Sequence, residues 1–436
     1  MEHTSTASLP LAQRFAAAAR LRRQLRSPSG LQFAIADALC MLNAAQWDAV
    51  TAEAGFFMQR DYLQMMEQAG PDNITPRYCL IYDGQQAVAA LYMQIANVSA
   101  RQLGPNRKQE KEDKANKEEG GKEEKRGKRE RALALLKRAI DPAAASLQAG
   151  LRERILVCGN LLSYGLHGIA FAPGAAPADI WPAIAEALYR VRRAEKLSGQ
   201  TDFVMIKDVT PEALPASQIM QKLSYAALET EPNMVLQLDP AWRNHADYLA
   251  SMQSKYRSAV KQQIYKPINE AGIEIAHLQD INAAAAELHA LYLQVHEQAS
   301  LRLFTLPEVY FPALLHVAGA DARCTVARKE GRILGFIITL KDGDTAYGYH
   351  IGFDKSVRLP LYLRLLHAAV EDAIAFGCRR LSLGRTALEP KARLGCQPEE
   401  ITVWVRHRQP VMNIFVRNLL RAVSHDEAPQ AHPFKK

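Results

Sequence analysis

The segment LGRTALEPKARLGC, residues 383–396, places a dense group of polar side chains directly after a short apolar stretch. Arginine offers a planar fork of donors that suits a carboxylate or a phosphate. A glutamate can take the proton of an attacking amine. The segment therefore has the side chains needed for anion binding and for acid–base chemistry. The candidates are Gly384, Arg385 and Thr386 for binding a cofactor, Glu389 as the general base, and Lys391 and Arg393 for binding substrate.

Each of these residues also has a purely structural interpretation. Arg385 can pair with Glu389 and fix the loop, while Lys391 and Arg393 can be solvated surface charges. Gly384 allows the backbone to approach a ligand closely. Glu389 is the first choice for the base, because no other carboxylate precedes Glu399 in this segment.

The stretch TAYGYHIGF, residues 345–353, predicts a strand that carries further candidates. Successive side chains of a strand point to opposite faces. Tyr347 and Tyr349 then share one face and His350 takes the other, so all three can line one cleft only if the strand has a bulge. Tyr349 and His350 are predicted as catalytic residues, and packing of the aromatic rings against a helix is the alternative.

A basic helix is predicted within residues 243–271. Arg257 and Lys261 lie one turn apart on one of its faces. Lys255, Tyr256 and Arg257 are the predicted substrate-binding residues of this helix, and a solvated basic face is the alternative.

The elements around the polar segment determine where it lies. LPLYLRLLHAAVEDAIAFG predicts a helix with Pro360 in its first turn and Gly377 after its last. The stretch CRRLSLG, residues 378–384, predicts the next strand. Two apolar strands joined by a returning helix are parallel neighbours, and open α/β sheets bind ligands at the carboxyl ends of such strands. The polar segment begins at one of these ends.

The same order of elements occurs twice. RYCLIYDGQQAVAALYMQIANV and RCTVARKEGRILGFIITL each predict a strand, a turn and a second strand, and each follows two predicted helices. GIAFAPG and DFVMIKDV predict strands on either side of a helix in the first half. A chain of 436 residues also exceeds what one core usually serves. We therefore expect an α/β protein with mixed sheets and two tandem copies of one fold.

The expected division is a first domain over residues 31–240 and a second over residues 241–410. NMVLQLDP, residues 233–240, closes the first domain in this interpretation, and ITVWVRHR, residues 401–408, adds a strand to the second. A basic helix is expected over residues 1–30, and a helix and tail over residues 411–436.

Composition limits the possible partners. The net charge is +8, of which the mixed-sign run at residues 107–131 supplies +3, from eleven basic and eight acidic residues. This run belongs to a low-complexity insertion at residues 105–135 that cannot form a core, so we expect no specific DNA binding. The basic N-terminal helix can touch an anionic membrane surface. No apolar run is long enough to span a bilayer, and no signal peptide is evident, so a cytoplasmic location is expected. The scattered cysteines predict no metal site.

Helix, hairpin, strand and helix, followed by a strand that ends in LGRT and a Lys-x-x-x-Gly element, resemble the GNAT superfamily of acyltransferases. The chain is most similar to its twin-domain branch, which includes the Fem-type peptidoglycan aminoacyltransferases. The segments QWDAVTAEAGFFMQRDYLQMMEQAG, DYLASMQSKYRSAVKQQ and LSLGRTALEPKARLGCQPEEITVWVRHR carry the resemblance. It spans most of residues 40–410 apart from the insertion.

This resemblance implies two GNAT-like folds with the active cleft in residues 241–410. An amine would attack a thioester or ester carbonyl, and a tyrosine would protonate a leaving thiolate. Acyl-CoA is the implied co-substrate, without a metal, and Lys355 and Arg358 are its predicted phosphate contacts. Their loop, DKSVRLP (residues 354–360), lacks the glycines with which most GNAT enzymes bind pyrophosphate.

The sequence thus predicts an acyl-CoA-dependent N-acyltransferase that acts on a small molecule or a cell-envelope precursor. Two alternatives stay open. One is aminoacyl transfer from tRNA to a peptidoglycan precursor, and the other is a catalytically silent module that binds cell-wall polysaccharide. The helical arm that Fem-type enzymes carry in the second domain is not evident here, and the insertion lies in the first domain.

Overall fold

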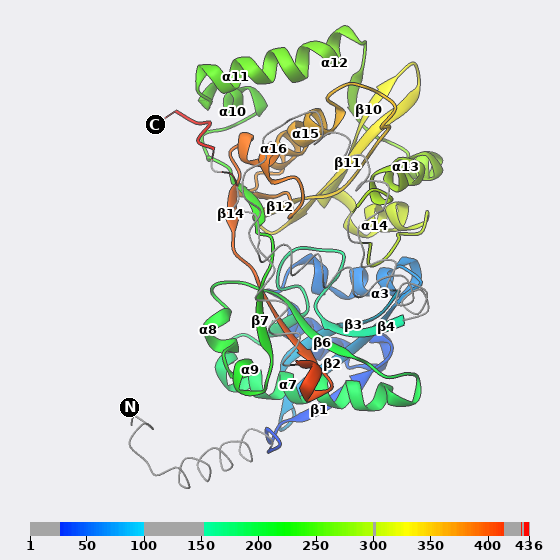
Figure 1. Cartoon of the computed structure of the whole chain (residues 1–436), viewed down its shortest axis with the longest axis vertical. Helices are drawn as coiled ribbons and strands as arrows, with labels where there is room; N and C mark the ends of the chain where they lie inside the picture. Colours follow the sequence, from blue (N-terminus) through cyan, green and yellow to red (C-terminus); the bar gives the residue numbers. More distant parts are fainter. Residues whose placement is uncertain (1–26, 100–151, 300–301, 414–428, 430, 436) are drawn as a thin grey trace, which may run out of the picture.

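The computed structural model describes residues 27–99, 152–299, 302–413, 429 and 431–435. It contains two mixed sheets, one above the other along the long axis of the molecule (Figure 1). The predicted basic N-terminal helix, the charged insertion and most of the C-terminal tail lie outside the described residues.

The first sheet has the order β1-β2-β3-β4-β6-β15-β7, and β5 pairs with β3. Neighbouring strands are antiparallel except for β4 and β6, which are parallel. The hairpin predicted at Asp83-Gly84 is confirmed by the pairing of β2 with β3. The strands are β1 Gln32–Ala36, β2 Ile74–Asp83, β3 Gln86–Ser99, β4 Arg152–Cys158, β5 Ile169–Phe171, β6 Phe203–Val209, β7 Ala226–Glu229 and β15 Thr402–His407.

Both faces of this sheet are covered because its strands are apolar on both sides. In β2, Cys79 and Ile81 pack with helix α7, whereas Tyr78 and Leu80 pack with helices α2 and α3. The helical segments of this half are η2 Leu39–Met41, α2 Ala44–Thr51, η3 Phe56–Met58, α3 Arg60–Ala69, α7 Pro177–Ala194, η5 Glu195–Leu197, α8 Leu214–Ser217 and α9 Ile219–Lys222.

The second sheet has the order β14-β8-β13-β12-β11-β10-β9. As predicted, its parallel pair is β12 with β13. Helix α15 covers one face, and helices α13 and α14 cover the other. The strands are β8 Asn233–Gln237, β9 Glu274–His277, β10 Ala322–Lys329, β11 Arg332–Asp342, β12 Thr345–Phe353, β13 Arg380–Ser382 and β14 Gln397–Glu399.

Helices of the second half agree partly with the predicted ones, and α14 and α16 were not predicted. The predicted helix after Pro360 is α15, Leu361–Ala375, and the basic helix is divided by a π-helical turn. The helical segments are α10 His245–Ser251, α11 Ser254–Val260, the π-helical turn η6 Lys261–Tyr265, α12 Lys266–Glu270, α13 Ile281–His296, α14 Tyr310–Ala318, η7 Gly319–Asp321, α15 and α16 Leu388–Arg393.

The two sheets exchange one strand with each other. Strand β8, from the end of the first half, lies between β13 and β14, whereas β15, from the end of the second half, lies between β6 and β7. The expectation that residues 233–240 close the first domain and residues 401–408 extend the second is therefore wrong. An apolar stretch predicts a strand, but the partners of that strand depend on contacts distant in sequence.

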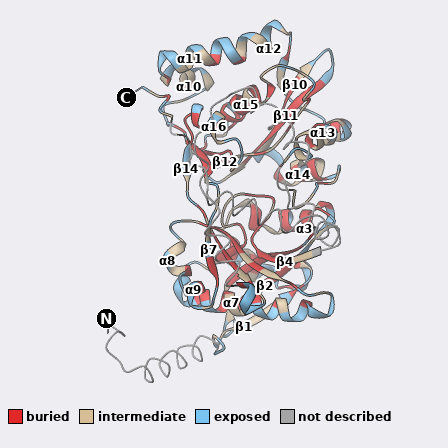
Figure 2. Cartoon of the chain, in the orientation of Figure 1, coloured by how far each residue is buried: buried red, intermediate tan, exposed pale blue. Residues whose placement is uncertain are grey.

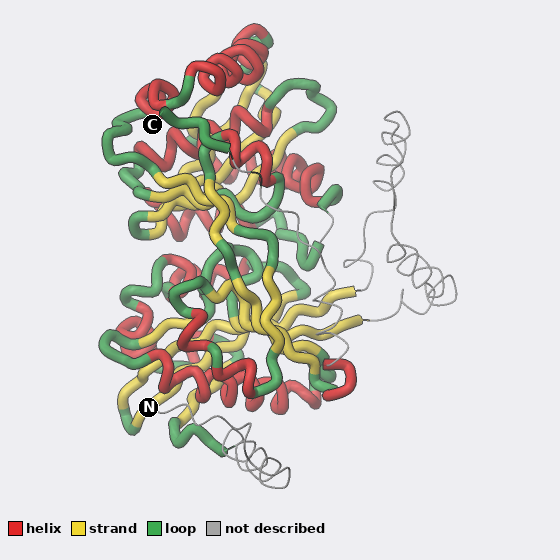
Figure 3. Tube along the Cα trace, turned by 60° about the vertical axis from the view of Figure 1, so that its left-hand side comes forward, coloured by secondary structure: helices red, strands yellow, loops and turns green. Residues whose placement is uncertain are grey.

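The sheets also share a core. Tyr62 of α3 belongs to the same buried cluster as Tyr310 of α14 and Phe336 of β11. Buried residues accordingly run through both sheets and the helices between them, whereas α11 and α12 are largely exposed (Figure 2). Figure 3 shows the two sheets from another side, with helices around each. None of the described helices is long and apolar enough to cross a membrane.

Candidate active site

Strand β12 has the bulge that its candidate residues require. On β11, Leu340 pairs with Tyr347, Thr339 with Gly348, and Ile338 with His350, so Tyr349 is the extra residue. The bulge turns Tyr349 and His350 toward the same helix, α14. Their ring centroids lie 4.2 Å apart, and the ring of His350 is 5.4 Å from that of Tyr310.

Three tyrosine hydroxyls meet at this bulge, between the two sheets. The hydroxyl of Tyr349 lies 3.2 Å from that of Tyr62 and 3.1 Å from that of Tyr310. Asn160 Nδ2 donates a hydrogen bond of 2.8 Å to the hydroxyl of Tyr62. Burial raises the pKa of all three hydroxyls, so they stay protonated at neutral pH and can donate to a developing negative charge.

His350 has an environment of another kind. Its Nε2 is buried and has no hydrogen-bond partner among the described residues. Burial lowers the pKa of the imidazole to about 3, so the ring is neutral at pH 7. Such a ring can form a hydrogen bond with substrate but is a weak base.

A loop of the first half, residues 159–168 between β4 and β5, also contacts β12. We call this region, where residues of both halves meet at β12, the junction. The ring of His167 stacks on Phe57 at 4.4 Å, its Nδ1 lies 2.8 Å from Ser163 Oγ, and its Nε2 lies 3.4 Å from the hydroxyl of Tyr347. Burial, and then the charge of Lys207, lowers the pKa of His167 to about 3. A neutral imidazole therefore lies beside the candidate strand.

Two glycines close the neck of this loop. A Cβ on Gly168 would lie 2.3 Å from the Cα of Gly159, so no side chain fits there. Our sequence analysis missed this loop and its histidine. The closely spaced glycines of GNLLSYGLHG were the one signal that could have indicated it.

Arg385 of the polar segment reaches across to the first half. Its guanidinium pairs with the fully buried carboxylate of Asp208, which also pairs with Lys207. Lys207 Nζ donates to Ser163 O at 2.6 Å, and burial followed by the charge of Arg385 lowers its pKa. Arg385 also lies over the ring of Tyr164, 5.6 Å from its centroid. The structural alternative, a pairing of Arg385 with Glu389, is not formed.

Gly384 and Lys391 lie next to this ion cluster. Gly384 has a φ of 76°, and a Cβ there would lie 2.6 Å from the Tyr164 ring. We predicted that a ligand approaches the backbone at Gly384. In the structure, the ring of Tyr164 from the first half lies there. Lys391, 2% exposed, donates to Gly384 O at 3.2 Å, and burial lowers its pKa to about 8. It is a buried amine rather than the solvated charge of the structural alternative.

The remaining residues of the polar segment are on the surface. Glu389 and Arg393 form an ion pair of 2.6 Å within α16, and each side chain is 65% exposed. Thr386 is also exposed. The structure thus does not bring Glu389 into contact with Tyr349 or His350, its predicted catalytic partners.

The loop before α15 is held by its own acidic residue. The carboxylate of Asp354, buried at 4% exposure, accepts hydrogen bonds from Ser356 N at 2.9 Å and Ser356 Oγ at 2.6 Å. These bonds and the nearby Arg332 lower the pKa of Asp354. Lys355 donates to Gln298, and Arg358 is exposed. In the loop predicted to bind phosphate, the backbone N–H of Ser356 thus donates to a carboxylate of the protein itself.

The candidates on the basic helix lie apart from the junction. Arg257 donates to Met252 O at 3.1 Å, Tyr256 packs on the core of the second sheet, and Lys255 is exposed. The solvated or structural interpretation agrees with these contacts.

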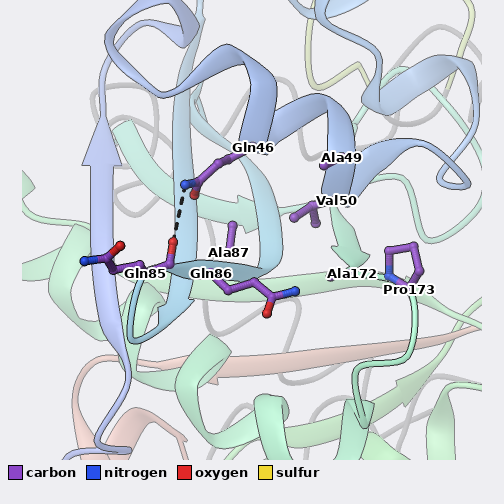
Figure 4. Close-up of a pocket in the computed structure, with 8 residues that line it drawn as sticks. All are labelled: Gln46, Ala49, Val50, Gln85, Gln86, Ala87, Ala172 and Pro173. Atoms are coloured by element: carbon purple, nitrogen blue, oxygen red, sulfur yellow. Dashed lines mark hydrogen bonds between the residues drawn. The ribbon is translucent and has the colours of Figure 1, made fainter.

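Two surface cavities occupy equivalent places in the two halves. One of about 560 Å³ lies between α2 and the β2–β3 turn, and includes Gln46, Gln85 and Pro173 in its lining (Figure 4). The other, of about 370 Å³, lies between α13 and the β10–β11 turn. Neither contains a predicted site residue. Among the described residues, no group of three or more His, Cys, Asp or Glu could hold a metal ion.

Comparison with known proteins supports the assignment of this fold. Residues 254–391 match the family model described as an acetyltransferase (GNAT) domain. The first sheet repeats the strand order of the second and has its parallel pair at the same place, so the chain has two GNAT-like folds, as the Fem-like resemblance implied. No curated protein matches the chain in sequence.

Several solved structures are similar over most of their length. FemX is 9% identical with a TM-score of 0.48, covering 82% of this chain and 94% of its own. A tandem GNAT protein from the clavulanic acid biosynthesis pathway is 12% identical with a TM-score of 0.46, covering 87% and 99%. L-PGS from Bacillus licheniformis is 10% identical with a TM-score of 0.44, covering 82% and 95%.

Proposed function

We propose that the chain transfers an acyl group from a CoA thioester to the amine of a small molecule or cell-envelope precursor, beside Tyr349 at the junction of the two sheets. The observation that carries this proposal is the bulged strand β12. Its tyrosine hydroxyls are protonated. Beyond Tyr347, the strand no longer pairs with its parallel neighbour β13, so the backbone of that edge is unpaired among the described strands.

Strand β12 pairs with β13 only through Thr345, Ala346 and Tyr347. It then continues to Phe353 with β11 as its one partner among the described strands. Backbone groups along such an edge can pair with an extended chain. The pantetheine arm of CoA has two amides and suits this edge.

The chemistry then follows from the buried groups. The amine nitrogen attacks the thioester carbonyl, the carbon–sulfur bond breaks, and the thiolate leaves. Tyr349 donates its proton to the sulfur and can recover one through the hydroxyls of Tyr310 and Tyr62.

The amine must lose a proton as it attacks. Lys391 is buried near the end of β13 and burial lowers its pKa to about 8, so we propose it in place of Glu389 as the base.

One observation favours a second candidate, aminoacyl transfer from charged tRNA. Asp354 places a buried carboxylate in the loop where CoA pyrophosphate would bind. A donor that does not use this loop would avoid the repulsion. Arg358 is exposed beside it and is the residue through which a CoA phosphate would be held.

A ligand-stability screen tests these candidates. We expect acetyl-CoA or a longer acyl-CoA to raise the melting temperature of the purified protein, and Arg358→Ala to reduce that shift. Release of free thiol in the presence of an amine would confirm transfer. Retardation of charged tRNA without any response to CoA would favour the second candidate. No response to either would favour the binding module.

A further inference from the structure

Arg364, in the first turn of α15, is a buried arginine without a counter-ion among the described residues. Its residue is 9% exposed, and Nη1 is buried without a hydrogen-bond partner among the described residues. Its guanidinium lies over the ring of Tyr265, 4.8 Å from the centroid. Arginine is rarely buried unless it is paired, because the charge loses its hydration. The ring compensates only part of that loss.

The groups around Arg364 are also donors or neutral bases. His245 Nε2 lies 3.2 Å from His367 Nδ1, and the hydroxyl of Tyr265 lies 3.4 Å from both ring nitrogens of His245. These side chains come from α10, the π-helical turn η6 and α15. Glu371 is two turns further along α15 and its charge acts on Tyr265, but it is exposed and makes no ion pair with Arg364 in the described residues.

The charge of Arg364 acts on both histidines of this cluster. Burial, and then the charge of Arg364, lowers the pKa of His245 to about 4. Burial, His245 and Arg364 also lower the pKa of His367. A bound anion would offset the guanidinium and reverse part of both shifts.

We propose that Arg364, His245, His367 and Tyr265 form a binding site for a small oxyanion, a phosphate or carboxylate group. The guanidinium supplies a fork of N–H donors that matches either group. The tyrosine hydroxyl and an imidazole N–H supply further donors. A π-helical turn contributes Tyr265, and such turns occur frequently at functional sites.

This site is distinct from the loop before α15 and from the tyrosine cluster at β12. Leu361 and Leu365 direct one face of α15 to the second sheet, whereas Arg364 and His367 contact η6 and α10. The inference does not rest on the proposed acyl transfer.

The test is thermal unfolding at pH 7 in sodium chloride, sodium phosphate or sodium acetate, each at the same ionic strength. We expect phosphate or acetate to raise the melting temperature by about 1–2 °C above chloride at concentrations near ten times the dissociation constant. A larger shift with phosphate identifies a phosphate group as the ligand, and a larger shift with acetate identifies a carboxylate.

Two substitutions make the test specific. Arg364→Met keeps the length of the side chain without its charge, so it should lose the anion shift and remain as stable as the wild type in chloride. Arg364→Lys keeps the charge without the fork, and should need a higher anion concentration for the same shift. Arg192→Met is the matched control, because Arg192 also lies over a tyrosine ring, at 5.7 Å from Tyr189, but in the first half. It should keep the full shift.

Several results would overturn the proposal. One is a wild-type melting temperature that is equal in all three salts. Another is an anion shift that persists in Arg364→Met. A third is an Arg364→Met protein that loses as much stability in chloride as in phosphate, which would make Arg364 a structural residue only.

Discussion

The hydroxyl of Tyr349 is the group at the junction best suited to protonate a leaving group. It belongs to a chain of three buried hydroxyls, and burial raises its pKa, so it carries its proton at any pH at which the protein is folded. The bulge, rather than strand alternation, brings it beside His350.

We therefore expect Tyr349→Phe to lower kcat/KM for acyl transfer by about 10- to 100-fold, because general-acid assistance is lost. Steady-state kinetics with the acyl donor identified in the stability screen would measure this. Tyr92→Phe is the matched control, since Tyr92 is equally buried and accepts a hydrogen bond from Gln94 in the first half. Equal activity of Tyr349→Phe and Tyr92→Phe would contradict the assignment.

His350 should make the folded protein sensitive to acid. Its pKa is lowered from 6.5 to about 3, so below pH 6.5 the unfolded chain binds a proton that the folded chain does not. The contribution of His350 to the free energy of unfolding is therefore complete above pH 6.5. It is lost by about 1.4 kcal/mol for each pH unit below 6.5. Urea unfolding of the wild type and His350→Phe should show a difference in stability that changes by about 2 kcal/mol between pH 7 and pH 5. A constant difference would show that the folded state already binds the proton.

Sequence reasoning found several residues of the junction but not their partners. The composition of LGRTALEPKARLGC indicated that Arg385 and Lys391 were unusual, and both are held in the interior of the molecule. The partner of Arg385 is Asp208, which is 177 positions away in the chain. Local spacing offered Glu389 as an alternative partner, because only nearby residues are evident in a sequence.

At the level of elements, the strands themselves were predictable and their pairing was only partly so. Hairpins and the β12–α15–β13 unit follow from turn residues and from the rule for parallel connections. The residues of β8 were recognised only as an apolar run and those of β15 as a strand, and each was assigned to the other half. Their apolar patterns are satisfied equally well by either sheet, so only the assembled fold determines the partner.

Because β8 and β15 each pair with strands of the other half, a core substitution in either strand should destabilise that other half. Trp404 of β15 packs in the core of the first half, and its Nε1 donates to Ser217 Oγ at 2.9 Å. We expect Trp404→Ala to cost about 3–5 kcal/mol. It should increase hydrogen exchange first in β6 and β7, although β14 is much closer in sequence.

Leu236→Ala in β8 is the reciprocal variant. Leu236 is fully buried in the core of the second sheet, so its truncation should increase exchange in β13 and β14. Increased exchange confined to the sequence neighbours of either residue would argue against the exchanged pairing.

At the scale of the whole molecule, two features join the halves. Each sheet contains a strand from the other half, and one buried cluster runs from α3 through α14 to β11. The boundary near residue 240 stays a prediction about where one repeat gives way to the next, and the shared cluster shows that the two halves do not have separate cores. Repeated patterns reveal copies of a fold and carry no information on whether those copies are independently stable.

Shared packing of this kind predicts cooperative unfolding of the two halves. Loss of β15 from the first sheet would leave β6 and β7 without their common neighbour, and loss of β8 would do the same to β13 and β14. Neither sheet can therefore unfold without exposing the edges and core of the other, which is costly.

We expect a single urea transition, with tryptophan fluorescence and far-UV circular dichroism giving the same midpoint. Trp47, Trp181 and Trp404 report on the core of the first sheet and Trp242 on that of the second, and helices of both halves contribute to the dichroism. Two separated midpoints would show that the exchanged strands do not couple the halves.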